Sequence, residues 1–121
     1  MILATGIDLI EIARIEKVVS RHGKHYLDRV YTPAELEQCG RRAESLAGRF
    51  AAKEAAVKAL GCGIGDVTWK EVEILGDEQN APVLTLYGAA KKKADELGLV
   101  NWSVSISHSQ SHSVAVIVAI G

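Results

Sequence analysis

Two carboxylates and one amine stand out in the sequence because their types and spacing suit chemistry on phosphates. Glu54 and Lys58 lie one turn apart in RFAAKEAAVKALG, a segment with helical spacing and small alanine neighbours. Asp8 lies much earlier, in the apolar stretch GIDLI, where an unpaired carboxylate would be costly. If the fold brings Asp8 to Glu54, the pair could share Mg²⁺, which favours one or two carboxylates with water and substrate phosphates. Lys58 would then neutralise phosphate charge, as phosphoryl-transfer chemistry requires.

Each of these residues also has a simpler structural interpretation. Asp8 and Glu11 have the spacing of a helix capping box, and such a cap stabilises a helix by about 1 kcal/mol. A cap and a metal are compatible, since one carboxylate oxygen can cap while the other faces a cation. Glu54 and Lys58 alone could be an exposed ion pair that contributes only about 0.3–0.5 kcal/mol. The hypothesis of a shared site therefore depends on Asp8 meeting Glu54.

A histidine near the carboxyl end is a further candidate. His108 follows Trp102, Val104 and Ile106 in strand alternation, which predicts a partly buried side chain at a strand end. It could bond to a neighbouring group, or donate a hydrogen bond to a phosphate. His112 follows four residues later, but the intervening HSQSH predicts a hairpin turn, so this spacing does not indicate a helical zinc site.

Composition narrows the class of protein. The 121 residues, 48% hydrophobic and 24% charged, predict one globular domain, residues 1–121. A net charge of −1 gives no support for a nucleic-acid partner. No signal peptide is visible and no apolar run approaches the roughly 20 residues that cross a membrane. Cys39 and Cys62 lack metal-binding spacing and an activating base nearby, so we expect a reducing, cytoplasmic location.

A row of basic residues follows the first strand. Arg14, Lys17 and Arg21 fall on one side of a helix expected over residues 12–22, and Lys24 lies beyond it. Such a row is either a solvated helix face or a surface that steers an acidic protein partner.

Local patterns predict the elements that position these residues. Apolar residues on both faces indicate a buried strand at 1–10, and TPAE starts a helix with Thr32 as its cap and Pro33 at the first position. GCGIG follows a helix and lacks the Lys-Ser/Thr of a phosphate loop, which favours a glycine cap. The expected elements are helices at 12–22, 32–40, 44–60 and 89–97 and strands at 1–10, 69–75, 82–87, 102–107 and 113–120. This order predicts an α+β fold with helices packed on a largely antiparallel sheet.

The segments GIDLIEIARIE and LAGRFAAKEAAVKALGCGIG together resemble the two signature segments of the bacterial holo-[acyl-carrier-protein] synthase family, the short 4′-phosphopantetheinyl transferases. The resemblance continues through VEI, the P-x-L-x-L-x-G strand, a Lys/Ala-rich helix and VSISHS, and so covers nearly the whole chain. The motifs are specific as a pair, because either one alone would be a weak signal.

The resemblance implies transfer of 4′-phosphopantetheine from coenzyme A to a serine of apo-acyl carrier protein, with release of adenosine 3′,5′-bisphosphate. It implies that Asp8 and Glu54 are the magnesium ligands and that Lys58 contacts the pyrophosphate. The serine would lose its proton to Glu54 directly or through water, and the sequence leaves both routes open.

The same resemblance implies further contacts. Arg49, Lys53 and His108 match positions at or near the coenzyme A site, and Arg14 and Arg21 match basic positions that dock the acidic helix of the carrier protein. It also implies a homotrimer with active sites between subunits. One departure is the turn GDEQNAPVL, where the family pattern has Gly or Gly-Lys before the proline.

Two other functions fit the same residues. A magnesium-dependent phosphohydrolase acting on nucleotides could use Asp8 and Glu54 as its metal pair. A non-catalytic adaptor could bind acidic proteins through Arg14 and Arg21.

Overall fold

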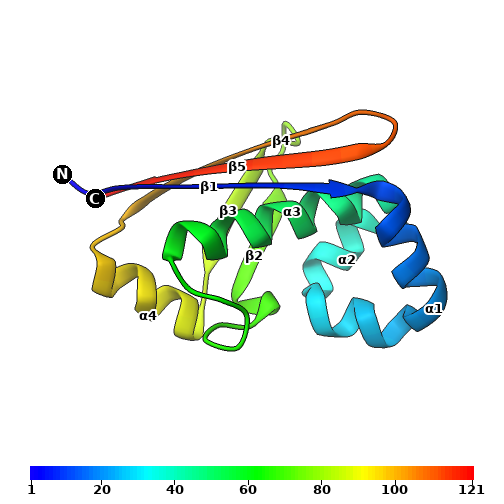
Figure 1. Ribbon diagram of the computed structural model, residues 1–121, viewed down its shortest axis with the longest axis horizontal. Coiled ribbons are helices and arrows are strands. Elements are labelled where there is room, and N and C mark those ends of the chain that lie inside the picture. Colours follow the sequence, from blue (N-terminus) through cyan, green and yellow to red (C-terminus); the bar gives the residue numbers. More distant parts are fainter.

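The computed structural model describes residues 1–121 and has an α+β architecture, as the sequence predicts (Figure 1). In chain order the elements are β1 (Leu3–Glu11), α1 (Ile12–Val30), α2 (Pro33–Cys39), α3 (Ala43–Leu60), the short 3₁₀ helix η1 (Trp69–Glu71), β2 (Val72–Gly76), β3 (Pro82–Leu86), α4 (Gly88–Leu97), β4 (Asn101–His108) and β5 (His112–Ile120). No helix is both long and apolar enough to cross a membrane.

The strands form two separate antiparallel sheets. The larger sheet has the order β1-β5-β4, and the smaller is the hairpin of β2 and β3. The long strands of the larger sheet run beside one another across the molecule, with α3 beneath them and the β4–β5 hairpin tip reaching toward α1 (Figure 1). This arrangement lays the middle of β1 against α3, so residues from both signature segments meet.

Helix α3 approaches β1 closely because small residues line the contact. Ala51 and Ala55 are fully buried on the helix. Gly6 on β1 leaves room for the helix, since a Cβ atom there would lie 1.8 Å from the carbonyl oxygen of Ala55. Alternation along β1 then places Asp8 on the same inner face as Gly6.

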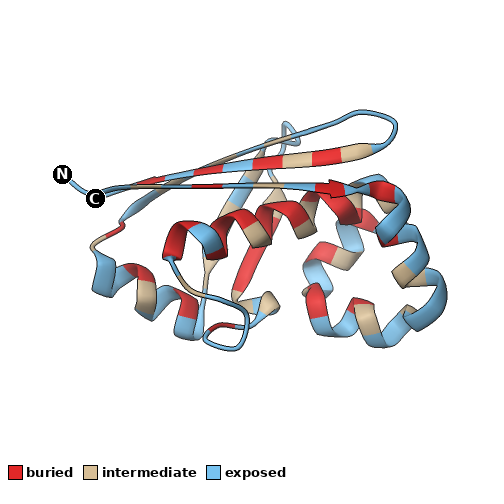
Figure 2. Cartoon of the chain, viewed as in Figure 1, coloured by how far each residue is buried: buried red, intermediate tan, exposed pale blue.

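The prediction that β1 is buried on both faces is wrong for the single chain. Its outer side chains stay exposed, because all the helices that contact the larger sheet pack on the other face (Figure 2). The outward positions of β5 continue this surface, since Ile7 pairs with Val116 across the strands. We call this surface the apolar outer face; its exposed members are Leu3, Ile7, Leu9, Val116, Val118 and Ile120.

Helix α1 is longer than the sequence predicts and its start is not capped by a side chain. It extends to Val30 across a kink at Gly23, whose φ of 46° and ψ of −124° are not helical. The N-cap residue is Glu11, and no side chain caps it, while Asp8 lies within β1. The capping-box interpretation of Asp8 and Glu11 is therefore wrong.

Other helix ends agree with the sequence. Thr32 caps α2 and forms a complete capping box with Glu35. Gly61 ends α3 in the left-handed conformation, so GCGIG begins with a glycine cap. Cys39 and Cys62 are both free thiols.

Candidate active site

The inner face of β1 meets α3 at an ion pair between Asp8 and Lys58. Lys58 Nζ lies 3.2 Å from Asp8 Oδ1 and donates a hydrogen bond to the Ile7 carbonyl oxygen at 2.9 Å. The Asp8 side chain is only 18% exposed, whereas that of Lys58 is 53% exposed. The amine is thus anchored to β1 at one side and open to solvent at another.

Glu54 completes this cluster from one helical turn before Lys58. Partial burial raises the pKa of Glu54, the negative charge of Asp8 raises it further, and Lys58 and Arg14 oppose the shift. No ion pair joins Glu54 to Lys58, because Lys58 pairs with Asp8 instead. The structure therefore brings Asp8, Glu54 and Lys58 together, as the hypothesis of a shared site requires.

The two carboxylates fit a hard divalent cation. Burial and the negative charge of Asp8 both raise the pKa of Glu54, and a cation between the two carboxylates would relieve their repulsion. The chain has no cluster of three or more metal-binding side chains, so the protein offers at most two carboxylates here. Magnesium commonly has such a donor set and takes its remaining oxygen ligands from water and phosphates.

Positive charge continues from the site along α1. Arg14 is close enough to Glu54 to lower its pKa against the effects of burial and Asp8. Arg14, Lys17 and Arg21 are exposed, as is Lys24 beyond them. The basic face of α1 therefore begins beside the carboxylates.

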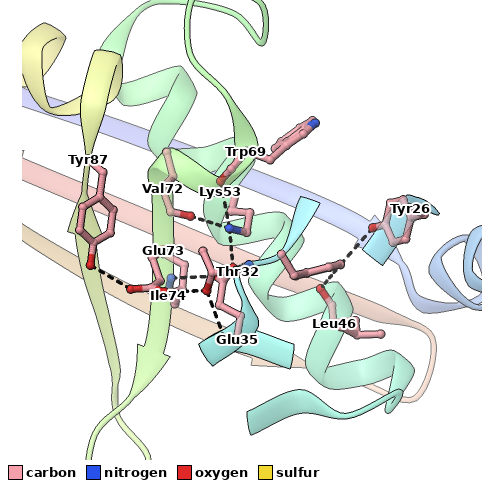
Figure 3. Close-up of polar contacts among 11 residues, drawn as sticks. Tyr26, Thr32, Glu35, Leu46, Lys53, Trp69, Val72, Glu73, Ile74 and Tyr87 are labelled. Carbon is pink, nitrogen blue, oxygen red and sulfur yellow. Dashed lines mark hydrogen bonds and ion pairs between the residues drawn. The ribbon is translucent and has the colours of Figure 1, made fainter. Parts of the chain in front are cut away.

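Lys53 does not join this cluster. Its side chain is fully buried, forms an ion pair with Glu35 at 2.8 Å, and donates to the carbonyl oxygens of Val72 and Trp69 at 2.6 and 3.0 Å (Figure 3). Burial lowers the pKa of Lys53, and the Glu35 carboxylate opposes this shift. Three acceptors use all three ammonium hydrogens. This placement contradicts the prediction that Lys53 contacts coenzyme A.

Arg49 lies where α2, α3 and β2 meet. Its Nη2 atom donates to Gln38 Oε1 at 3.1 Å, and that same oxygen accepts a bond from the amide of Gly76 at 2.8 Å. The Nε atom of Arg49 is buried without a partner. Arg49 thus has an unused donor, although its contacts within the chain are with α2 and not with Asp8 or Glu54.

His108 is exposed at the end of β4, so the prediction of a partly buried side chain is wrong. The tip of the β4–β5 hairpin is exposed (Figure 2). His108 lines a surface hollow of about 520 Å³ with Ile12, Glu44 and two residues of the hairpin turn. Its ring is therefore accessible to a ligand.

Sequence reasoning missed two residues that build the site. Gly6 permits the close contact between β1 and α3, and its position two residues before Asp8 was the only signal. Glu35 is the buried partner of Lys53, but the capping box already accounts for a glutamate in TPAE without any tertiary role.

Comparison with known proteins places these features in context. Residues 4–117 match the model of the 4′-phosphopantetheinyl transferase superfamily. The holo-[acyl-carrier-protein] synthase of Herpetosiphon aurantiacus is 49% identical, covering 98% of this chain and 99% of the relative. That of Dehalococcoides mccartyi strain CBDB1 is 44% identical, covering 97% of this chain and 98% of the relative.

Solved structures give the same result. The Helicobacter pylori holo-[acyl-carrier-protein] synthase in complex with coenzyme A superposes with a TM-score of 0.88 at 39% identity, over 96% of this chain and 99% of the other. A Bacillus anthracis holo-(acyl-carrier-protein) synthase in complex with CoA (3′,5′-ADP) has a TM-score of 0.78 at 34% identity, over 96% and 94% of the two chains.

Proposed function

The chain belongs to the holo-[acyl-carrier-protein] synthase family of the 4′-phosphopantetheinyl transferase superfamily, and we propose that Asp8, Glu54 and Lys58 form its catalytic centre. Its activity is transfer of 4′-phosphopantetheine from coenzyme A to a serine of apo-acyl carrier protein, with release of adenosine 3′,5′-bisphosphate. The observation that supports this centre is the meeting of Asp8 from one signature segment with Glu54 and Lys58 from the other.

Asp8 and Glu54 would hold Mg²⁺, which when bound supplies positive charge against the diphosphate of coenzyme A. Lys58 has a half-exposed ammonium beside these carboxylates, so it can donate to a diphosphate oxygen and neutralise charge as the leaving group departs. Its bond to the Ile7 carbonyl oxygen holds the ammonium in place before the substrate arrives.

In the transfer step the serine oxygen of the carrier protein forms a bond to the β-phosphorus, which carries the pantetheine. The bond from that phosphorus to the bridging oxygen breaks, and adenosine 3′,5′-bisphosphate leaves with the electron pair. As a carboxylate beside the diphosphate, Glu54 would accept the serine proton. Proton transfer through an intervening water fits the same geometry.

Arg49 and His108 are proposed contacts for the rest of coenzyme A. The partly exposed guanidinium of Arg49, which always carries a positive charge, and the exposed ring of His108 support these roles. Lys53 is left out of this set because its three donors are used inside the chain.

The carrier protein would dock on the basic face of α1. Arg14 and Arg21 are exposed there, and Arg14 influences the charge of Glu54, so an acidic helix bound to this face would lie next to the catalytic centre. This contact gives orientation and a faster encounter more than it adds affinity.

We also propose that the chain assembles as a homotrimer through the apolar outer face, with coenzyme A bound between subunits. The exposure of Ile7, Leu9 and Val118 on one continuous surface supports an interface, because apolar patches of this kind are uncommon on monomers. Residues 1–121 would act as one domain, since one hydrophobic core draws on every helix from α1 to α4. The two free cysteines agree with a cytoplasmic location.

One experiment tests the activity and separates the alternatives. Apo-acyl carrier protein is incubated with coenzyme A, Mg²⁺ and the purified protein, and its mass is measured. We expect the serine to gain one phosphopantetheinyl group, with bisphosphate released only when carrier protein is present. Bisphosphate release without carrier protein would indicate a phosphohydrolase, and binding without a mass change would indicate an adaptor.

A further inference from the structure

The buried ion pair between Lys53 and Glu35 joins α3 to three other elements. Glu35 lies on α2, and the two carbonyl oxygens that accept bonds from Lys53 belong to Trp69 of η1 and Val72 of β2 (Figure 3). Both side chains of the pair have no exposed surface. The pair is therefore a directional contact inside the core, between α3 and the α2–β2 side of the molecule.

Glu35 is itself held on every side. Its Oε1 atom accepts a hydrogen bond from the backbone amide of Thr32 at 2.8 Å, and its Oε2 atom accepts one from the backbone amide of Ile74 at 2.9 Å. The neighbouring Glu73 accepts the hydroxyl of Thr32 at 2.6 Å and that of Tyr87 at 3.1 Å. Lys53 thus binds to a carboxylate whose position is fixed by β2 and by the cap of α2.

Much of the buried surface of α3 is made of small side chains, although Leu46, Val57 and Leu60 are buried as well. The helix packs mainly through alanines, and a surface of methyl groups tolerates sliding and rotation better than one of large, interlocking side chains. The buried alanines of α3 are Ala47, Ala51, Ala52, Ala55, Ala56 and Ala59. Directional contacts, those of Lys53 with Glu35 and β2 and that of Lys58 with the Ile7 carbonyl oxygen, therefore help to specify one register for such a helix.

We propose that the Lys53–Glu35 pair is a positioning device that holds Glu54 opposite Asp8. Lys53 directly precedes Glu54, and neighbouring residues of a helix are tied by a rise of about 1.5 Å and a rotation of about 100°. A shift of α3 at Lys53 therefore moves the Glu54 carboxylate by the same amount. The inference rests on the proposed function, since it concerns the cation that Asp8 and Glu54 would share.

A purely stabilising role predicts something different. Replacing a buried ion pair with neutral groups of similar size is often neutral or favourable for stability, whereas removing one partner leaves an unpaired buried charge. The double variant Lys53→Met/Glu35→Gln leaves no buried charge and loses one acceptor for the amides of Thr32 and Ile74, so it should be less stable but still fold. If the pair positions Glu54, this folded variant will still bind the metal poorly.

The experiment measures Mn²⁺ affinity by electron paramagnetic resonance in the presence of coenzyme A, together with kcat and the KM for carrier protein. We expect the double variant to have a Mn²⁺ dissociation constant raised about tenfold and a lower kcat, as for changes in groups that orient metal ligands. The KM for carrier protein should stay unchanged, because α1 carries the docking residues. The matched control Lys91→Met/Asp95→Asn removes an exposed pair on α4 and should bind Mn²⁺ as the wild type does.

A second variant keeps the test decisive if the double variant does not fold. Glu35→Asp retains both charges but shortens the carboxylate arm by one methylene, so it should fold with α3 displaced and with a raised Mn²⁺ dissociation constant. Wild-type Mn²⁺ affinity and kcat in either folded variant would overturn the positioning role. Absence of Mn²⁺ binding by the wild type itself would instead count against the proposed function.

Discussion

The ammonium of Lys58 on α3 lies 3.2 Å from Asp8 Oδ1 on β1, across a separation of fifty residues. This contact joins the two signature segments directly. Asp8 lies within a strand and Lys58 within a helix, so neither residue belongs to a loop. Lys58 also bonds to the carbonyl oxygen of Ile7, so the amine keeps a partner on β1 even if Asp8 binds a cation. The catalytic centre therefore rests on rigid parts of the fold.

Replacing Asp8 should remove the metal and leave the fold. We expect Asp8→Asn and Asp8→Ala to lose Mn²⁺ binding and to lower the transfer rate by at least about 10²-fold, a typical result when a charge-stabilising group is removed. Circular dichroism should show a folded chain, since Lys58 keeps its bond to Ile7. Transfer is measured by the mass of the carrier protein. Full activity in either variant would refute the assignment.

Charge reversal on α1 should weaken carrier binding alone. For Arg21→Glu we expect the KM for carrier protein to rise about tenfold while kcat stays the same, because the lost attraction acts on the encounter and docking. The difference from wild type should shrink as salt is added. Arg29→Glu, an exposed change farther along the same helix, is the control. An equal effect of both variants would mean that only net charge matters.

A charge on the apolar outer face should prevent assembly. Val118→Asp places a carboxylate among the exposed apolar side chains of β1 and β5, and burying it in an interface would be costly. We expect light scattering to give the mass of a trimer for the wild type and of a single chain for the variant. Thr85→Asp, on the exposed side of β3, should leave the mass unchanged. A wild type that stays monomeric would contradict the proposed assembly.

Gly6→Ala should separate β1 from α3. The added Cβ would lie 1.8 Å from the carbonyl oxygen of Ala55, so the helix must move away. We expect the free energy of unfolding to fall by at least about 2 kcal/mol, at the upper part of the range for overpacked cores. Urea unfolding checks this value. Gly63→Ala is the control because a Cβ there meets nothing within 4 Å, and an equal loss there would refute the explanation.

Glu71 should make stability depend on pH. Its carboxylate accepts hydrogen bonds from the backbone amides of Thr68 at 2.7 Å and Ala89 at 2.6 Å. These bonds hold the pKa of Glu71 below its ordinary value of 4.5. A lowered folded-state pKa means that the unfolded chain binds the proton more tightly. The stabilisation is therefore complete well above pH 4.5 and is lost as the pH falls through the folded-state pKa.

The variant Glu71→Gln tests this dependence. At neutral pH we expect it to lose about 1 kcal/mol of stability, a usual value for a lost cap, and in strong acid the difference from wild type should disappear. Thermal unfolding at several pH values measures both. Glu78→Gln in the exposed β2–β3 turn should show no such dependence. A difference that persists in strong acid would rule out the ionised carboxylate as the cause.

Local sequence signals predicted the elements well. Strand alternation, glycine caps and the capping box of Thr32 depend on near neighbours in the chain, and the structure has each element where these signals place it. The exceptions are residues 69–71, which form the 3₁₀ helix η1 and not the start of a strand, and α1, whose second half follows the kink at Gly23. Helical periodicity is broken there, so the pattern did not show that a helix resumes.

The residues of the candidate site also differ in how far local sequence signals could predict them. Asp8, Glu54 and Lys58 were found because their types and apolar surroundings limit what they can do, and the structure brings them together. Lys53 was assigned to the coenzyme A site by the family resemblance, and no local pattern shows a buried acid such as Glu35 as its partner. The exposure of His108 depends on what packs against the tip of the hairpin, which is also a tertiary property.

Alternation along β1 has a consequence for how this sequence can evolve. Gly6 and Asp8 point toward α3, while Ile7 and Leu9 point outward. Inserting or deleting one residue before this stretch, with the pairing to β5 kept, would exchange the two sets. One such mutation would then disrupt both the catalytic centre and the oligomer interface. Selection should therefore remove insertions and deletions from this strand more strictly than from any loop.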